Sequence, residues 1–132
     1  MIAKQLSVFI QNEPGRLLEV TEALYAANVN ISAMNIAETA DYGIVRMIVD
    51  DTDKAVAALK ASGVSAKSTD VLRVVFPDVP GSINSMLKSL AKENINVSYM
   101  YGYSGNGVAP MVVRVSDTHR ALEALKRDGI VK

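Results

Sequence analysis

The chain has 132 residues with fourteen basic and fourteen acidic side chains, and this zero formal charge argues against a nucleic-acid partner. Cysteine is absent and there is one histidine, which excludes disulfides, thiol catalysis and a histidine-rich metal site within one chain. Hydrophobic residues make up 49% of the sequence, yet no uncharged apolar run reaches the ~18 residues of a membrane span. With no leader-like start either, we expect a cytoplasmic protein.

The first half of the sequence predicts two helices among four strands. Pro14 suits a first helical turn, and apolar residues follow it at helical spacing. Asp51 and Gly63 are the residue types of an N-cap and of the position after a helix end. The predicted order is a strand over 4–10, a helix over 16–27, strands over 29–38 and 44–50, a short helix between Asp51 and Gly63, and a strand over 64–69.

The second half repeats this order at a fixed offset. A shift of 66 places (80 minus 14) lays Pro80-Gly81 on Pro14-Gly15, and the matches continue to Gly129 on Gly63. Such a period indicates a duplicated unit. We therefore expect two modules, residues 1–69 and 70–132. Only 130–132 remain for the last strand of the second module, which is missing, leaves an open edge, or is replaced by 64–69 or by a strand from a partner.

The order βαββαβ is that of the split ferredoxin-like fold, an α+β arrangement with both helices on one face of an antiparallel sheet. With Pro-Gly before the first helix and Asn-x-Asn before the second strand, each half resembles the ACT domain, a small amino-acid-sensing module. The chain as a whole is similar to free-standing bacterial proteins made of tandem ACT repeats. This resemblance implies a ligand site between the strand-helix loop of one module and the second strand of a neighbouring module.

The first half carries groups that suit the two ends of an amino acid. A helix start presents unpaired amides, here those of Gly15, Arg16 and Leu17, to a carboxylate. Glu13 can pair with an ammonium group, and asparagine side chains can bind either end. By the resemblance, two sets of residues face each other across modules: Asn12, Glu13, Pro14, Gly15, Arg16 and Leu17, and Asn28, Asn30 and Ile31.

The second half predicts a similar but altered site. Asp78 replaces Asn12, and Val79 replaces Glu13. A carboxylate at position 78 repels the carboxylate of a ligand and attracts its amino group, so the two sites need not be equally competent, and we favour the first. The residues of the second site are Asp78, Gly81, Ser82, Asn94, Asn96 and Val97.

Other polar residues have structural interpretations. Asparagine tolerates the left-handed backbone found where helices end, so the four asparagines that follow the first helices have a structural alternative. Arg46 and Arg114 interrupt apolar strands without aligning under the shift, and we place them in solvent or at an interface. His119 lies at a helix start without a nucleophile or a second histidine, so we expect an exposed residue and no catalytic base.

Tyr99, Tyr101 and Tyr103 alternate along one strand and therefore share one face of the sheet. Such rings stack nucleic-acid bases in some βαββαβ domains, but those sheets carry the basic charge that is missing here. Packing against a helix or a partner subunit is the alternative that we favour. The strand over 44–50 is apolar on both faces, which also indicates contact with another module or chain.

Two functions remain open from the sequence. The first is a non-catalytic regulatory or sensor protein that binds a small amino acid, without a cofactor, as a homodimer or higher oligomer. The second is a regulatory subunit that acts by protein contact on an amino-acid biosynthetic enzyme, such as a branched-chain acetohydroxyacid synthase. An activity of its own is disfavoured because no nucleophile-base pair or metal-binding set is present. We expect no membrane partner.

Overall fold

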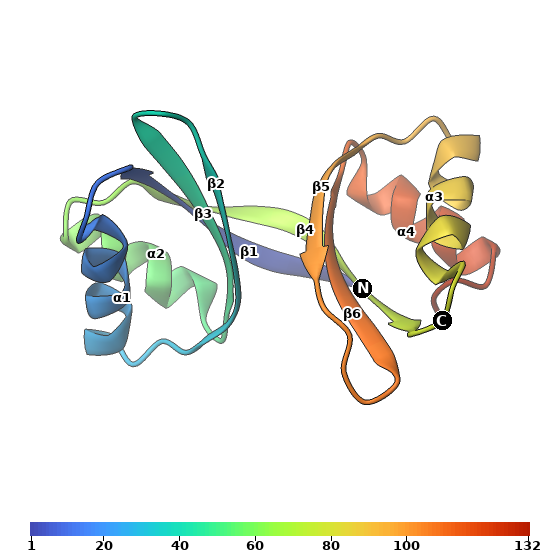
Figure 1. Ribbon diagram of the computed structural model, residues 1–132, viewed down its shortest axis with the longest axis horizontal. Coiled ribbons are helices and arrows are strands. Elements are labelled where there is room, and N and C mark those ends of the chain that lie inside the picture. Colours follow the sequence, from blue (N-terminus) through green and yellow to red (C-terminus); the bar gives the residue numbers. More distant parts are fainter. The chain divides into compact units, whose positions relative to one another are not determined.

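The computed structural model describes all 132 residues, with six strands and four helices (Figure 1). The strands are β1 (Ile2–Gln11), β2 (Ile31–Glu38), β3 (Tyr42–Val49), β4 (Ala66–Pro77), β5 (Val97–Gly102) and β6 (Val108–Val115). The helices are α1 (Arg16–Ala26), α2 (Thr52–Ala61), α3 (Ser82–Lys92) and α4 (Thr118–Arg127). This order confirms the predicted ferredoxin-like α+β architecture. None of the helices is long and apolar enough to cross a membrane.

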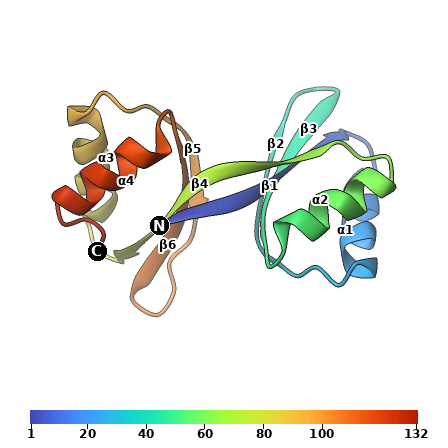
Figure 2. The same ribbon diagram turned by 180° about the vertical axis from the view of Figure 1, so that it is seen from behind.

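The chain divides into two compact units, which differ slightly from the expected modules 1–69 and 70–132. We call Lys4–Thr69 the N-terminal unit, and Asp70–Lys132 together with Met1–Ala3 the C-terminal unit. In each unit two helices cover one face of an antiparallel sheet (Figures 1 and 2). The strand expected over 64–69 and the first strand of the second repeat are one continuous strand, β4. Both β4 and β1 contribute residues to both units.

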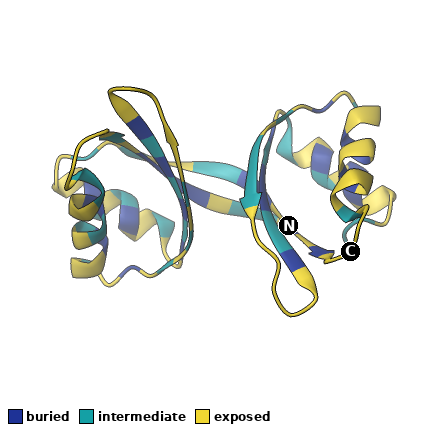
Figure 3. Ribbon diagram, viewed as in Figure 1, coloured by how far each residue is buried: buried dark blue, intermediate teal, exposed yellow.

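The N-terminal unit has the strand order β2-β3-β1-β4. Leu6 and Val8 of β1 lie opposite Met47 and Val45 of β3, and all four are buried. Figure 3 shows buried stretches in both strands and helices of the structure. Burying each such side chain contributes roughly 1.5–3 kcal/mol. The core of this unit consists of Leu6, Val8, Val20, Leu24, Val29, Val45, Met47, Val49, Ala55 and Leu59.

The C-terminal unit has β4, β6 and β5 side by side, in that order. Leu72 of β4 and Met100 of β5 both lie opposite Val113 of β6. The helices α3 and α4 close this core with residues four apart, which places them on one face of each helix. The buried residues are Leu72, Val74, Phe76, Met86, Leu90, Ile95, Ala109, Val113, Val115, Ala121 and Leu125.

The outer edge of β4 in the C-terminal unit is covered by the first residues of the chain. The Met1 ammonium donates a hydrogen bond to the Arg73 carbonyl at 3.0 Å, and the Arg73 amide donates to the Met1 carbonyl at 2.8 Å. Such a reciprocal pair is typical of antiparallel strands. The side chain of Ile2 packs on the C-terminal core, as do Ile130 and Val131, which form no strand. The expected closing strand is therefore supplied by Met1–Ala3, which the sequence had placed in the first module.

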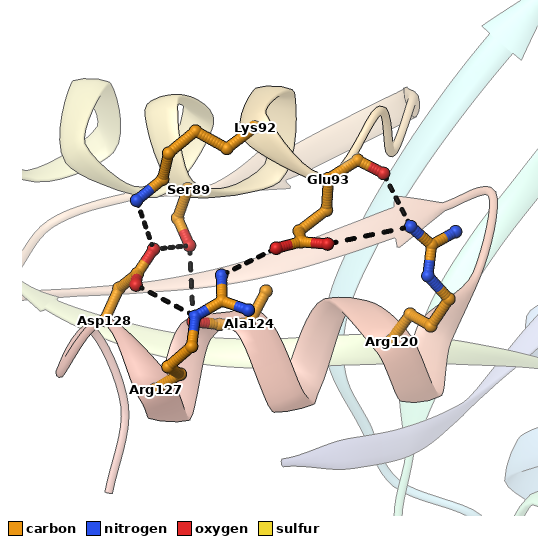
Figure 4. A network of polar contacts seen from close by, with 7 residues as sticks. All are labelled: Ser89, Lys92, Glu93, Arg120, Ala124, Arg127 and Asp128. Carbon is orange, nitrogen blue, oxygen red and sulfur yellow. Dashed lines mark hydrogen bonds and ion pairs between the residues drawn. The ribbon is translucent and has the colours of Figure 1, made fainter.

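Polar side chains join α3 to α4 in the C-terminal unit (Figure 4). The buried Ser89 hydroxyl donates to Oδ2 of Asp128 at 2.7 Å, and Lys92 and Arg127 pair with the same carboxylate at 3.1 and 3.3 Å. Arg127 also reaches Glu93, at the end of α3, at 2.9 Å. The N-terminal unit has no such network, because its equivalent residues are Ala23, Ala26, Ala27, Ala61 and Ser62.

The local signals of the sequence are found in the structure. Asp51 and Asp117 accept hydrogen bonds from the amides of Lys54 and Arg120, as expected for N-caps. His119 is exposed at the start of α4, as expected. Arg46 and Arg114 differ from the expectation of solvent exposure, because both are half-buried and Arg114 donates to the Asp70 carbonyl at 2.7 Å. Of the three alternating tyrosines, Tyr99 and Tyr101 are half-buried, whereas Tyr103 follows β5 and is 82% exposed.

Candidate ligand-binding site

Each unit makes a sharp turn where its first strand leads into its first helix. Gly15 precedes α1 with φ 85°, and Gly81 precedes α3 with φ 95°. Side chains rarely adopt this left-handed conformation, whereas glycine does so without steric cost. A Cβ at either position would meet no atom within 4 Å. The backbone conformation, and not a lack of space, therefore requires glycine here.

The helix starts present backbone amides that have no acceptor in the chain. The Arg16 amide donates weakly to the Glu13 carbonyl at 3.3 Å, and the Ser82 amide donates to the Val79 carbonyl at 3.4 Å. The neighbouring amides make no hydrogen bond; these are the amides of Gly15 and Leu17 at α1, and of Gly81 and Ile83 at α3. No side chain caps either helix. Unpaired amides at the positive end of a helix dipole favour an anion.

Asn12 is hydrogen-bonded to the hairpin turn between β2 and β3 through both its backbone amide and its side-chain nitrogen. Its backbone amide donates to the Asp41 carbonyl at 2.9 Å. Its side-chain nitrogen donates to Oε2 of Glu38 and to the Thr39 carbonyl, both at 3.3 Å, and to the Ala40 carbonyl at 3.5 Å. Asn12 was predicted to offer this nitrogen to a ligand, but the structure uses it to hold the loop. Only the side-chain oxygen remains available.

Asp78 keeps only the backbone part of this arrangement. Its amide donates to the Gly107 carbonyl at 3.0 Å, which matches the bond from Asn12 to Asp41 under the 66 shift. A carboxylate has no hydrogen to donate, so the side-chain bonds of Asn12 have no equivalent in the C-terminal unit. The two loops therefore share a backbone path and differ in how firmly they are tied to the neighbouring hairpin.

The charges at the two helix starts also differ. Arg16 lies between Glu13 at 3.2 Å and Glu19 at 3.1 Å, and its hydrogen bonds to Glu19 and Glu13 raise its pKa. The start of α3 has no acidic residue in its first turn, and the Ser82 hydroxyl donates to the Pro77 carbonyl at 2.7 Å. Since two carboxylates flank the start of α1, its local charge does not favour an anion there over one at α3. Arg16 offsets part of this negative charge, and Asp78 places a carboxylate in the loop before α3, so the preference for the first site stays a prediction.

A hollow of about 310 Å³ borders the first loop. It is lined by Gln11, Asn12, Glu13, Ala40, Asp41 and Tyr42. The carboxylates of Glu13 and Asp41 give it acceptors for an ammonium group. Asp41 and Tyr42 were not among the predicted site residues. The turn at 41–43 was recognised in the sequence, but its position beside Asn12 follows from the strand order, in which β3 pairs with β1.

The asparagines that follow the first helices occupy structural positions. Asn28 and Asn94 have φ 58° and 55°, the left-handed conformation expected at a helix end. The amides of Asn30 and Asn96 donate to the side chains of Asp50 and Ser116, both at 3.0 Å. The side-chain amides of all four asparagines make no hydrogen bond in the chain, so these groups remain available to a ligand.

Within one unit the two predicted sets of site residues do not meet. Asn12 to Leu17 surround the start of α1, whereas Asn28, Asn30 and Ile31 follow its end (Figure 1). With 11 residues, α1 separates the two sets by about 16 Å. In the C-terminal unit, α3 separates Asp78, Gly81 and Ser82 from Asn94, Asn96 and Val97 in the same way. A site made of both sets therefore requires two modules.

Comparisons with known proteins agree with this architecture. The family model of the ACT domain pair matches residues 1–130. The structure is similar to that of protein BT0572 from Bacteroides thetaiotaomicron, with 46% identity, a TM-score of 0.93, and coverage of 98% of this chain and 90% of that chain. No curated protein matches the sequence.

More distant structures share the fold. The regulatory subunit of aspartate kinase from Thermus thermophilus, in a ligand-free form, has 15% identity, a TM-score of 0.67, and coverage of 97% of both chains. The same subunit from Thermus flavus has 17% identity, a TM-score of 0.63, and coverage of 97% of this chain and 96% of that chain. The family match spans nearly every residue and both repeats, and the chain therefore belongs to the family of ACT domain pairs.

Proposed function

We propose that this protein is a non-catalytic, cytoplasmic regulator that binds a small amino acid as a homodimer or higher oligomer. The observation that carries the proposal is the repeated helix start, where a left-handed glycine leaves amides without an acceptor in both units. Membership of the ACT domain pair family supports the same function.

The chemistry of the site follows from the available groups. The ligand carboxylate binds the amides of Gly15 and Leu17, or those of Gly81 and Ile83, at the positive end of the helix. The ammonium group binds the side-chain oxygens of Asn30 or Asn96 from another module. Within one unit these two sets of groups lie too far apart to bind the same ligand. Ligand binding therefore favours an arrangement that brings two modules together. A ligand shifts such an equilibrium through its different affinity for the two arrangements.

Thermal unfolding of the full chain with each of the twenty amino acids tests the proposal. A ligand at about one hundred times its Kd adds about 2.7 kcal/mol, which raises Tm by several degrees. We expect the double variant Asn30→Ala and Asn96→Ala to abolish the shift, since it removes the ligand contact at either site and leaves the backbone bonds to Asp50 and Ser116 intact.

Gln11→Ala is the matched control, because Gln11 borders the hollow beside the first loop and has no assigned contact with the ligand. Its ligand-induced shift is expected to equal that of the wild type. The absence of any shift with all twenty amino acids at millimolar concentration would refute the function. A shift that persists in the double asparagine variant would refute the site.

A further inference from the structure

The sheet of the N-terminal unit carries apolar side chains on the face opposite its helices. Val8 and Val45 are buried in the core on the helix side. Side chains alternate along a strand, so the adjacent Phe9 and Ile44 point to the other face. Phe9 lies opposite Ile44, and Ile44 lies opposite Ala37. These three residues form a row across β1, β3 and β2, in which Phe9 is 43% exposed.

This row lines a hollow of about 280 Å³. The side chains around it are those of Phe9, Ala37, Glu38, Thr39, Tyr42 and Ile44. Small-molecule pockets are mostly apolar with a few polar groups, and their volumes begin at about 300 Å³. The hollow therefore suits the apolar part of a ligand with few carbon atoms.

A lysine supplies positive charge beside this hollow. The ammonium nitrogen of Lys67 lies 6.0 Å from the centre of the Phe9 ring, within the range of a cation–π contact. Lys67 makes no ion pair or hydrogen bond in the chain. Glu38 is the carboxylate in the lining, and its Oε2 already accepts a hydrogen bond from Asn12 at 3.3 Å. The charged group that remains without a polar partner is therefore the ammonium of Lys67.

We infer that this hollow binds a small carboxylate with an apolar chain or ring. The apolar part packs on Phe9 and Ile44, and the carboxylate pairs with Lys67. A lysine ammonium is a compact charge on a flexible stem, which matches a ligand with one negative charge. This ligand needs no ammonium group, and the hollow includes no residue of a helix start. The inference therefore goes beyond the amino-acid site of the proposed function.

Titration of the isotope-labelled full chain with sodium hexanoate, followed by nuclear magnetic resonance, tests the inference. We expect the amide signals of Phe9, Tyr42 and Ile44 to shift. Acetate lacks the apolar chain and is expected to bind at least about tenfold more weakly. Hexylamine has a similar chain and the opposite charge, and is expected to bind several times more weakly than hexanoate.

Two variants separate the roles of charge and shape. Lys67→Glu is expected to weaken hexanoate binding about fivefold or more, because it replaces an attraction by a repulsion. Ala37→Phe places a ring in the hollow and is expected to abolish binding. Both positions are exposed, and the Tm of each variant verifies folding. Lys60→Glu and Ala57→Phe make the same changes on the exposed surface of α2, and both are expected to bind hexanoate like the wild type.

Several outcomes would overturn the inference. These are the absence of shifts with hexanoate at millimolar concentration, tighter binding of hexylamine than of hexanoate by the wild type, and unchanged binding by Lys67→Glu. Shifts confined to Gly15 and Leu17 would overturn it too, since they would place hexanoate at the helix start. Altered sedimentation of Ala37→Phe without hexanoate binding by the wild type would instead make this face a contact between copies.

The failure of this inference is distinct from the failure of the proposed function. Hexanoate binding that persists in the double variant Asn30→Ala and Asn96→Ala, with no amino-acid shift in the wild type, refutes the proposed function and leaves the hollow as a site. An amino-acid shift without hexanoate binding refutes the hollow only.

Discussion

At the scale of the residue, Asp128 shows how the two repeats diverge in chemistry while keeping one backbone. Its hydrogen bond from Ser89, followed by those from Lys92 and Arg127, lowers its pKa from 3.8 to about 2. Because the folded state binds this proton less readily than the unfolded state, the carboxylate stabilises the fold above about pH 4. This contribution disappears as the pH falls from about 4 to about 2.

Replacement of this carboxylate gives a prediction about pH. We expect Asp128→Asn to unfold at a lower temperature than the wild type at pH 6, and the difference in Tm to shrink as the pH approaches 2. Circular dichroism melts at several pH values measure it. Asp53→Asn, on the exposed surface of α2, is the control and is expected to show a small difference at every pH. A difference for Asp128→Asn that is independent of pH would contradict this interpretation.

The loop residue Asn12 gives a second prediction at this scale. Asn12→Ala removes three exposed hydrogen bonds to the hairpin turn, and we expect a loss of about 1 kcal/mol in the free energy of unfolding. Asp78→Ala, at the equivalent position, makes no such bonds and is expected to cost much less. Urea denaturation of both variants measures the two losses. Equal losses would show that the side-chain bonds do not hold the loop.

Residue types that act through neighbours in the sequence were predictable. The N-caps Asp51 and Asp117 and the left-handed asparagines were recognised, because each depends on contacts within a few positions. The bonds of Asn12 were not, since their acceptors lie 26 to 28 positions away in the chain. Asp41 and Tyr42 were not predicted as site residues for the same reason, because they are far from Asn12 in the sequence and lie beside it only in the folded chain.

At the scale of the element, the sequence period predicts the helices and strands well but misassigns one short segment. The 66 shift places residues 1–3 with the first repeat, whereas Met1–Ala3 complete the second. The period of the sequence gives only the order of the elements along the chain. It does not determine which segment pairs with the edge of β4 in the folded protein. Composition does not reveal this, because Ile2 is equally suited to either core.

This assignment makes a prediction about Ile2. Although it stands near the start of the chain, its side chain packs on the core of the C-terminal unit. We expect Ile2→Ala to cost about 1–2 kcal/mol there, less than for a fully buried site. Hydrogen exchange followed by mass spectrometry is expected to show faster exchange in β4, β6 and α4, with little change in α1 and α2. Faster exchange confined to the N-terminal unit would contradict the assignment.

At the scale of the whole molecule, the duplication conserves the backbone and varies the surfaces. The two helix starts have equivalent turns, yet one is flanked by Glu13 and Glu19 and the other is not. The duplication could be predicted from the sequence, because the residues that recur at the 66-residue period belong to the helices and strands that form the two cores.

The sharing of β1 and β4 between the units has a consequence for any attempt to separate the two repeats. A gene fragment that encodes 70–132 alone would leave the Arg73 amide and carbonyl without their partners at Met1. An unprotected strand edge of this kind invites aggregation. Residues 70–132 are therefore incomplete without Met1–Ala3, and a cut between the two repeats exposes the edge of β4 in the second.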